Sequence, residues 1–598
     1  MQQFRVRLTQ GLGVLALASA FAGSLGAQAL PNPMPLKYVG PATKSAITAG
    51  DLMTRLYKYA DDSMMGRAVG TEYNLKATAY IESEVRRLGL MPAGDNGGYF
   101  QDIGMMHRSM DVSSTLTIDG VQYKAGVDFI VATNGPGRKI DNAQVYVWLI
   151  FDAASAPTAA QLAGKLVALR TSPQPAQAEI QAWQKSPAYQ TYLSVAQGMS
   201  PAVGIISVAG DTFTTARVKS AMDPNAAGAS MAAAGAPMNL AVTTRVMTAI
   251  LGNMLVNTPS GTIGKAVSVE ARFTDVPRGG RNVVAILPGS DSKLKGQYVA
   301  IGAHNDHIGF ATRTVGQHDS LRIVNMHIRP AGAEGGRNMQ ANPVTPEEWA
   351  KINAEIADLR KIYPERSDSI FNGADDDGSG SVSVLEIAEM FAKGSAKPKR
   401  SILFVWHTGE EAGMLGSGFF MDHPTVPRDS IVAQLNIDMV GRGEATDVTG
   451  QAKGPQDSTG RFTGPGAELH GAPNYVQLVG SRRLSTELGD LVEKVNTDKK
   501  HGFVFDYNID ADGHQQNIYC RSDHWSYGKW GVPVVFFTTG GHADYHQVTD
   551  EPQYIQYDHM ARIDKLIFDI AVAAANLNHR LVVDHPKPNP VPATSCKQ

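Results

Sequence analysis

The chain has 598 residues, of which 43% are hydrophobic and 19% are charged, and its formal net charge at pH 7 is −3. A chain of this length is long enough for two or three domains with buried cores. The nearly balanced charge and the lack of a Lys/Arg run argue against a surface that binds phosphate backbones, so we expect no nucleic-acid partner.

Residues 1–29 have the pattern of a secretory signal peptide. Arg5 and Arg7 precede an apolar stretch at 12–22, and 27–29 form a small-residue cleavage site. The alternative is a membrane anchor, but the stretch is interrupted by Gly and Ser and is short for a span. No later segment has the long uncharged run of a transmembrane helix. We therefore expect a secreted or periplasmic protein without a membrane span once the signal peptide is cleaved.

Residues 30–109 are predicted to be mostly helical. Ala77, Ile81, Val85 and Leu88 recur at helical spacing, and Gly89 is a typical residue at which a helix ends. We expect this segment to be the N-terminal helical part of the same domain as residues 264–580.

Residues 110–263 consist of short β-rich runs, with predicted strands at 145–151, 165–169 and 202–208. An Ala/Gly-rich stretch at 226–237 indicates a loop. Few His, Asp or Glu residues cluster in this block. We therefore expect an inserted β-rich accessory domain that does not carry the chemistry.

Residues 264–580 alternate predicted strands with predicted helices. This pattern indicates an α/β domain with a mixed, largely parallel central sheet flanked by helices. The predicted strands are 282–287, 297–302, 401–406, 431–437 and 533–538, and the clearest helix is 381–391.

Two long insertions interrupt this domain. The first, 311–369, is polar and contains a predicted helix at 346–362, and the second, 444–471, is a predicted loop. Long loops in compact domains are often functional lids, and the alternative is decoration without a function.

Residues 581–598 form a Pro-rich tail that we expect to run extended over the surface. The only two cysteines are Cys520 and Cys596. They could pair, and the sequence does not decide it, but we expect two free thiols.

Five short motifs place His, Asp or Glu directly after apolar runs, where an open α/β sheet binds its ligands. They are GAHNDH at 302–307, NGADDDGSG at 372–380, HTGEEAG at 407–413, NIDMVG at 436–441 and ADYHQV at 543–548. A neutral imidazole such as that of His304 is a good zinc ligand. Asp306 is near enough in sequence to reach the other nitrogen of the ring and fix its tautomer.

The acidic residues of the other motifs also favour a metal site. The three consecutive carboxylates at 375–377 repel one another unless a cation is near. Of the paired Glu410 and Glu411, one can bind metal while the other moves a proton. Asp438 ends an apolar run, and burying an unpaired carboxylate is costly. A lone histidine such as His546 is more often a structural residue than a metal ligand. His546 becomes a candidate ligand because four other such motifs precede it.

Together these motifs resemble the co-catalytic di-zinc aminopeptidase family, which includes bacterial leucyl aminopeptidases and glutamate carboxypeptidases. The resemblance spans about 264–570, and extends to the helical segment through Met65, Gly66, Arg67 and Gly70. Residues 164–169 and 202–206 are similar, less closely, to the protease-associated domain often inserted in such enzymes.

The resemblance implies two Zn²⁺ ions per chain and a role for each matching residue. His304 and Asp438 would hold one ion, Glu411 and His546 the other, and Asp376 would bridge them. Asp306 would orient His304, Glu410 would be the general base, and Tyr519 would contact the substrate. A cis peptide bond at Asp376–Asp377 is also implied, whereas the long 311–369 insertion departs from the family pattern.

The implied activity is removal of N-terminal residues from peptides. A carboxypeptidase on the same fold is a first alternative, because Arg521 or Arg442 could hold a substrate carboxylate. A glutaminyl cyclase is another, although cyclases of this fold need fewer metal ligands. A receptor-like homologue without catalysis is an alternative of a different class. The oligomeric state is not predicted.

Overall fold

The structure is a computed structural model. It describes residues 30 and 34–589, except 133–138, 172–175, 197, 227, 232–236, 316–317, 329–343, 444–473 and 515, together with 591–593, 596 and 598. The predicted signal peptide at 1–29 and the predicted loop at 444–471 lie outside the described residues. Within the described part of the chain, none of the helices is long and apolar enough to cross a membrane.

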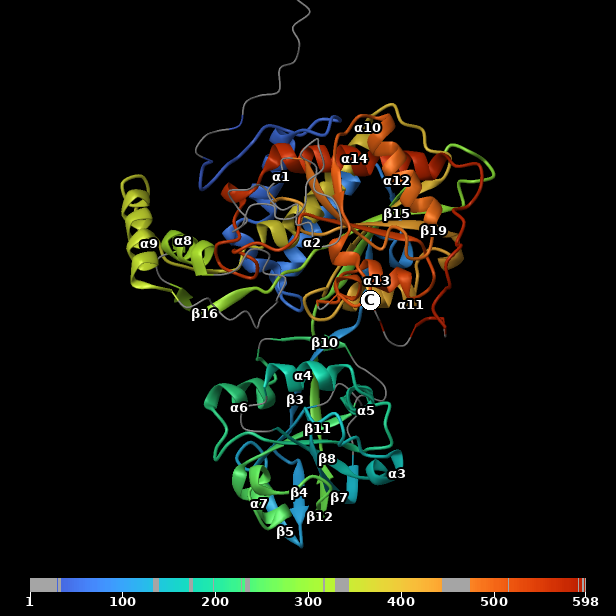
Figure 1. Ribbon diagram of the computed structural model, residues 1–598. Coiled ribbons are helices and arrows are strands. Elements are labelled where there is room, and N and C mark those ends of the chain that lie inside the picture. The colour runs from blue at the N-terminus through green and yellow to red at the C-terminus, as the bar shows by residue number, and fades with distance from the viewer. Residues whose placement is uncertain are drawn as a thin grey trace, which may run out of the picture.

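A nine-stranded sheet forms the centre of the larger unit, at the top of Figure 1. Its order is β1-β14-β18-β15-β19-β22-β20-β21, and β2 also pairs with β14. The strands are β1 Met91–Pro92, β2 Phe100–Asp102, β14 Arg281–Leu287, β15 Tyr298–His304, β18 Ser401–His407, β19 Ile431–Ile437, β20 Tyr475–Val479, β21 Val504–Asp506 and β22 Val534–Thr538.

The strand directions confirm the predicted mixed, largely parallel sheet. β15 is parallel to both β18 and β19, and β19 is parallel to β22. By contrast, β14 is antiparallel to β18, and β20 is antiparallel to β22. All five predicted strands are present with slightly different ends. The parallel strands therefore end at one shared edge of the sheet.

Helices cover both faces of this sheet. One face packs against α1 Ala49–Tyr59, α2 Glu72–Leu88, α10 Gly380–Lys393, α12 Thr486–Asp498 and α14 Tyr557–Asn576, and the other against α11 Leu415–Asp422 and α13 His524–Gly528. Along β14, Val283 and Ala285 belong to the first core, whereas Val284 belongs to the second. This alternation follows from the two-residue period of a strand, and explains why strands buried on both faces are almost wholly apolar.

Helix α2 shows how local sequence sets these elements. The Thr71 hydroxyl caps its first turn by accepting from the Asn74 N–H, and Gly89 ends it with φ 74°. Ala77, Ile81 and Val85 are fully buried against the sheet. The helical prediction for this segment is confirmed, and its apolar face is what attaches residues 30–109 to the central sheet.

The β-rich unit, at the bottom of Figure 1, has its own eight-stranded sheet and its own core. Its order is β5-β4-β12-β7-β8-β9-β11-β6. The strands are β4 Thr115–Ile118, β5 Val121–Lys124, β6 Phe129–Ala132, β7 Lys139–Leu149, β8 Leu166–Arg170, β9 Gly204–Val208, β11 Met238–Val242 and β12 Ile263–Glu270, and the helices are α3 Ala159–Leu162, α4 Gln177–Gln184, α5 Pro187–Ala196, α6 Thr215–Met222 and α7 Thr244–Leu251.

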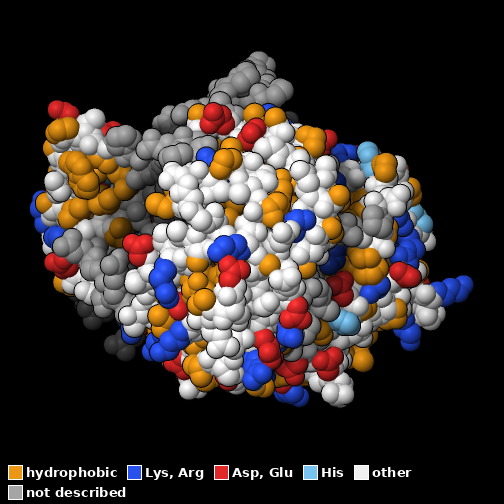
Figure 2. Space-filling model, turned by 90° about the horizontal axis from the view of Figure 1, so that it is seen from below, with side chains coloured by type: hydrophobic (Ala, Val, Ile, Leu, Met, Phe, Trp, Pro, Cys, Tyr) orange, Lys and Arg blue, Asp and Glu red, His pale blue; other side chains and the backbone are white. Residues whose placement is uncertain are grey.

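Three predicted strands of this unit correspond to β7, β8 and β9. Strand β12 pairs with β4 and β7, so this sheet includes residues beyond position 263. A three-stranded sheet consists of β10 Ser230–Met231, β3 Met105–Met110 and β13 Phe273–Pro277. In Figure 1, β10 is labelled between the two units and β3 within the β-rich unit. Figure 2 views the molecule from the β-rich end, where acidic and basic side chains are interspersed.

The 311–369 insertion projects from one side of the larger unit, at the left of Figure 1. It contains a ribbon of β16 Phe310–Val315 and β17 Asp368–Ile370, and two helices, α8 His318–Ile328 and α9 Pro346–Leu359. The predicted helix corresponds to α9, which Thr345 and Glu348 start with a capping box.

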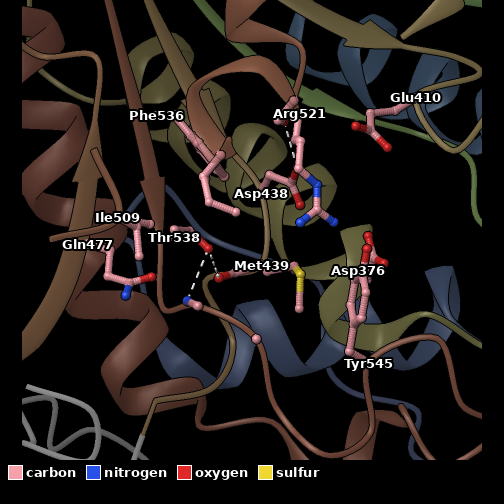
Figure 3. A pocket seen from close by; sticks show the side chains of 14 residues that line it. Asp376, Glu410, Asp438, Met439, Gln477, Ile509, Arg521, Phe536, Thr538 and Tyr545 are labelled. Atoms are coloured by element: carbon pink, nitrogen blue, oxygen red, sulfur yellow. Dashed lines mark hydrogen bonds between the residues drawn. The ribbon is translucent and has the colours of Figure 1, made fainter. Parts of the chain in front are cut away.

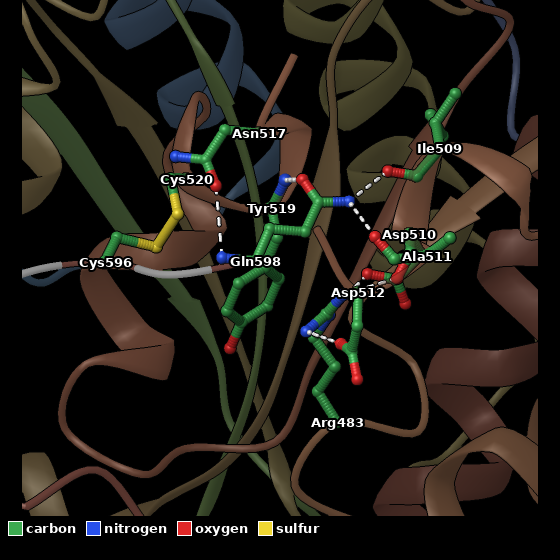
Figure 4. Close-up of a disulfide and its surroundings, with 10 residues drawn as sticks. All are labelled: Arg483, Ile509, Asp510, Ala511, Asp512, Asn517, Tyr519, Cys520, Cys596 and Gln598. Carbon is green, nitrogen blue, oxygen red and sulfur yellow. Dashed lines mark hydrogen bonds and ion pairs between the residues drawn. A yellow bond between two sulfur atoms is a disulfide. The ribbon is translucent and has the colours of Figure 1, made fainter. Parts of the chain in front are cut away.

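Cys520 and Cys596 form a disulfide, so the expectation of two free thiols is wrong. Cys596 and Gln598 lie against the segment 509–520, and the Cα atoms of the two cysteines are 5.7 Å apart. Gln598 holds this arrangement in Figure 4: its side chain accepts from the Tyr519 N–H and donates to the Ile509 carbonyl, and its N–H donates to Asn517. A pair 76 residues apart depends on this tertiary placement, which sequence spacing does not reveal.

Candidate metal centre

The predicted ligands come together at the edge where the parallel strands end. His304 is the last residue of β15, Glu411 lies four residues after the end of β18, and Asp438 directly follows β19. Asp376 lies in the short π-helical turn Ala374–Ser379 directly before α10, where its own φ/ψ angles are non-helical, and His546 lies in an irregular segment after β22. A site outside the carboxyl ends of parallel strands is where folds of this class bind ligands.

Asp376 occupies the middle of the site. Its Oδ1 lies 3.2 Å from His304 Nε2, and its Oδ2 lies 2.9 Å from His546 Nε2. The two oxygens of one carboxylate therefore face two imidazoles that come from opposite ends of the domain sequence.

On one side of Asp376, His304 forms a group with Asp377 and Asp438. His304 Nε2 lies 3.6 Å from Asp438 Oδ1. The Ser522 hydroxyl donates to Asp438 Oδ2 over 2.7 Å, and Asn436 donates in turn to Ser522. These two hydrogen bonds therefore fix the orientation of the Asp438 carboxylate.

On the other side, His307, Asp376, Glu411 and His546 form a second group. Glu411 Oε1 lies 2.7 Å from His307 Nδ1, and Glu411 Oε2 lies 3.1 Å from His546 Nε2. The sequence interpretation assigned no role to His307, although it is the last residue of the first motif. Its position three residues after His304 was the available signal.

The three consecutive aspartates have separate environments. Asp377 accepts N–H bonds from His304, Gly380 and Met439. Asp375 accepts the Gly441 N–H and contacts His542. Only Asp376 of the three reaches both groups. The peptide bond Asp376–Asp377 is cis, as the resemblance implies.

The buried atoms of the site fit a bound cation. Several of them lack a hydrogen-bond partner although they are shielded from water: His304 Nε2, His307 Nε2, Asp376 Oδ2, Glu411 Oε1 and His546 Nε2. Such atoms are costly unless something satisfies them. Imidazole nitrogens and carboxylate oxygens are the donor set of zinc sites.

The charges of the site depend on one another. Burial opposes a charged His546, but Asp376 and Glu411 outweigh it and raise its pKa to about 10. Burial likewise opposes an ionised Asp376, but the nearby His304 and His546 imidazoles hold its pKa well below the usual value. In the protein alone, protons on the imidazoles therefore supply positive charge that a metal ion can supply instead.

Glu410 lies beside the two groups. Burial raises its pKa well above the ordinary value, and Asp438 and Glu411 add to the effect. Its N–H donates to Asp306 Oδ1 over 3.1 Å. His304 Nδ1 lies 3.1 Å from the Asp306 carbonyl oxygen and 3.7 Å from its carboxylate. Asp306 thus connects the backbone of Glu410 to the ring of His304.

A cavity opens on these carboxylates (Figure 3). Asp376, Asp438 and Glu410 line one part of it, and the rest is lined by Met439, Gln477, Ile509, Ile518, Arg521, Ser522, Phe536, Thr538, Gly540, Gly541 and Tyr545. The combination of an apolar wall and an acidic end suits a ligand with an apolar group and a cationic or metal-bound end.

Tyr519 is not among the lining residues. It is 6% exposed, and its ring packs between His524 and Trp525 under the Arg483 guanidinium. This placement does not support the predicted substrate contact. Tyr545, which stacks on His546 with ring centroids 4.0 Å apart, is the tyrosine that faces the cavity.

The two arginines considered as carboxylate-binding groups differ in position. Arg521 lines the cavity, and in Figure 3 its guanidinium points toward the carboxylates. Arg442 is 1% exposed and lies 2.9 Å from Asp544. Arg442 is therefore part of the framework and not of the cavity wall.

Residues 282–571 match the model of Peptidase family M28. Leucine aminopeptidase 1 of Colletotrichum graminicola is 30% identical over 269 residues, which cover 41% of this chain and 59% of that protein. Leucine aminopeptidase 1 of Ajellomyces capsulatus is 29% identical over 216 residues, which cover 34% and 48%. The chain thus spans about half the length of these curated relatives. An aminopeptidase structure from Aneurinibacillus sp. strain AM-1 aligns with a TM-score of 0.42 at 15% identity, over 90% of this chain and 98% of that one.

Proposed function

We propose that this chain, whose residues 282–571 match the model of Peptidase family M28, is a two-zinc aminopeptidase that removes N-terminal residues from peptides. The observation that carries the proposal is the position of Asp376. One of its oxygens faces the His304 group and the other faces the group of Glu411 and His546. A single carboxylate between two sets of donors is what a two-metal centre requires.

The zinc ligands proposed are those that the geometry brings together. His304 and Asp438 would hold one ion, Glu411 and His546 the other, and Asp376 both. His307 contacts Glu411 and would hold that carboxylate in place. The ions would lower the pKa of a bound water and polarise the scissile carbonyl.

The protein's own groups would move the proton. Glu410 lines the same cavity, and a carboxylate with a raised pKa accepts a proton readily near neutral pH. It would take the proton from the attacking water and pass it to the leaving amine. Asp306 would position both Glu410 and His304, because it contacts the Glu410 N–H and the His304 ring.

The substrate's amino-terminal residue would bind in the cavity. The apolar wall includes Ile509, Ile518 and Phe536, which favours an apolar side chain next to the free amine. The carboxylates at the opposite end suit the positive charge of that amine. Tyr545 is placed to contact the substrate, in the role that the sequence assigned to Tyr519.

A carboxypeptidase is the second candidate, because Arg521 lines the cavity and could hold a substrate carboxylate. Peptides with free ends, with acetylated N-termini and with amidated C-termini distinguish the two activities on zinc-loaded protein. We expect N-acetylation to abolish cleavage and C-amidation to leave it unchanged. The reverse pattern would reject the aminopeptidase and favour the carboxypeptidase.

The variant Glu410→Gln tests the proposed base. It should keep its zinc, because Glu410 is not a proposed ligand, and lose about a hundredfold in kcat, as general bases typically do. Metal analysis by mass spectrometry and hydrolysis of leucine p-nitroanilide measure the two quantities. Near-normal turnover with normal zinc content would reject the assignment.

Export and a protease-associated-like role for the β-rich unit complete the proposal. The pattern of residues 1–29 supports export. The separate sheet and core of the β-rich unit support a domain of its own. Expression in a bacterium with an intact secretion system tests the first part: protein recovered outside the cytoplasm should begin at Leu30, and an unprocessed cytoplasmic product would contradict it.

A further inference from the structure

We propose that the 311–369 insertion clamps the segment 540–551, which we call the His546 segment, and thereby sets the affinity of the second metal group. The inference deepens the proposed function, on which it rests. It assigns Arg322 and Arg366 as positioning residues that act on His546 without touching the metal or the substrate.

The His546 segment has no helix or strand of its own within 540–550. His546 adopts φ 55°, in the left-handed region that non-glycine residues seldom occupy. Neither a regular backbone ladder nor local preference therefore holds this ligand in position. Its position depends on the side chains that fasten the segment at other points.

Asp544 is the first of these points, two residues before His546. Its side chain is buried and accepts from three sides. Arg442 of the central domain lies 2.9 Å away, Arg322 Nε of α8 donates over 3.1 Å, and the Thr549 hydroxyl donates over 2.6 Å. Arg322 belongs to the insertion, so the insertion supplies one of the two cations that fix this carboxylate.

Glu551 is the second point, at the other end of the segment. Arg366 donates to both of its oxygens, over 3.0 and 2.6 Å. His318, which is fully buried, lies 3.5 Å from Glu551 and 3.2 Å from Asp368. The insertion thus contacts the His546 segment on both sides of the metal ligand.

The residues just after the His546 segment take part in the same contact. Asp319 of the insertion lies 3.3 Å from Arg366, and the Tyr554 hydroxyl donates to Asp319 over 3.1 Å. Asp319 therefore joins the insertion's own arginine to the chain just beyond the His546 segment.

His318, Asp368 and Glu551 are close enough to be considered as a further metal group. Arg366 argues against that interpretation, because its two N–H groups already hold the Glu551 carboxylate. The positive charge that a metal would bring is already present in the guanidinium. These residues therefore form an ion-pair cluster that holds the His546 segment in place.

The His546 segment also reaches the bridging ligand. Asp550 accepts the N–H groups of Asp375 and Asp376 over 3.0 and 3.1 Å. A displacement of the segment would therefore shift Asp376 as well as His546. Without the clamp, metal binding would itself have to order this segment, so the affinity for the second ion would fall. Loss of a residue that orients ligands from outside typically costs 10–100-fold in metal affinity.

The test is zinc titration of metal-free full-length protein against a competing chelator. Arg322→Gln and Arg366→Gln should bind the second ion at least about tenfold more weakly. The first ion shares Asp376 but keeps His304 and Asp438, so its binding should weaken less. Lys351→Gln is the matched control, because Lys351 is an exposed cation on α9 of the same insertion. It should bind both ions like the parent protein.

Two further measurements separate the clamp from general damage. Hydrogen exchange of peptides covering 540–551 should become faster in Arg322→Gln and stay unchanged in Lys351→Gln. Arg322→Lys keeps the charge and should recover most of the affinity. Excess zinc should restore peptide hydrolysis by Arg322→Gln, since a missing clamp weakens binding but leaves every ligand in place.

The inference is overturned if the arginine variants bind both ions normally, or if both ions weaken equally. It is also overturned if Arg322→Lys behaves like Arg322→Gln. Failure of the proposed function gives a different result, in which the parent protein binds two ions and cleaves no peptide. In that case the affinity differences between variants still decide whether the clamp exists.

Discussion

Removal of the Cys520–Cys596 disulfide should destabilise the larger unit substantially. The bond closes a loop of 76 residues between the strand-bearing core and the last residues of the sequence. In the chain-entropy model a loop of that length restricts the unfolded state by about 4 kcal/mol. The hydrogen bonds of Gln598 remain available in Cys596→Ser, so the measured loss should be about 2–4 kcal/mol.

Urea unfolding of Cys596→Ser, Cys520→Ser and the double variant measures this effect without reductant. All three variants lack the same bond, so they should lose the same free energy of unfolding. Dithiothreitol should lower the stability of the parent protein to their level and leave Cys596→Ser unchanged. A loss below about 1 kcal/mol, or a double variant much less stable than either single one, would refute the reasoning.

Loss of the disulfide should also affect the cavity wall. Gln598 donates to the Ile509 carbonyl and accepts from the Tyr519 N–H, and Ile509 and Ile518 line the cavity. Releasing the last residues would loosen this wall without touching the metal ligands. We therefore expect Cys596→Ser to raise KM for substrates with a large apolar N-terminal residue more than it lowers kcat. A fall in kcat with unchanged KM would contradict this coupling.

Three further predictions follow from the packing and charges of the larger unit. Asp376→Asn should retain fewer than two zinc ions per chain by mass spectrometry, because both groups lose their shared carboxylate, and retention of two would reject the bridging role. A Cβ at Gly380 would overlap the Asp377 carboxylate, so Gly380→Ala should lose about 1–3 kcal/mol of unfolding free energy, measured with urea. Gly418 lies in a helix with space around it, so the control Gly418→Ala should be neutral or slightly stabilising. Burial raises the pKa of Glu386 to about 7 from an ordinary 4.5, so between these pH values the folded protein holds a proton that the unfolded chain releases. The free energy of unfolding should therefore fall as pH rises from about 4.5 to 7. Glu386→Gln should flatten that part of the stability-against-pH profile.

The sequence predicted the fold well because its signals are local. Continuous apolar runs such as 401–406 and 431–437 indicate strands buried on both faces, and helices between them require a largely parallel sheet. Parallel strands end at one edge, so motifs that follow them converge. His304, Asp438 and Glu411 can therefore be grouped from the sequence alone, although they are far apart in the chain.

Sequence patterns are least informative where contacts depend on tertiary packing. Tyr519 is three residues from Ser522, which contacts Asp438, yet its ring turns into a buried cluster, and Tyr545 faces the cavity instead. Cys520 and Cys596 pair only because the last residues return to the segment 509–520. His307 needed the position of Glu411 to show its relevance. Sequence spacing alone does not determine these contacts.

The run of three aspartates indicates which carboxylate would contact the proposed cation. Backbone N–H groups compensate Asp375 and Asp377, since these carboxylates accept bonds from Gly441 and from His304, Gly380 and Met439. The Asp376 carboxylate instead contacts the imidazoles of His304, His307 and His546. The fold therefore supplies backbone N–H donors to the two outer carboxylates and leaves the middle one for a partner that enters from the cavity, which is why Asp376 and not its neighbours is the bridging candidate.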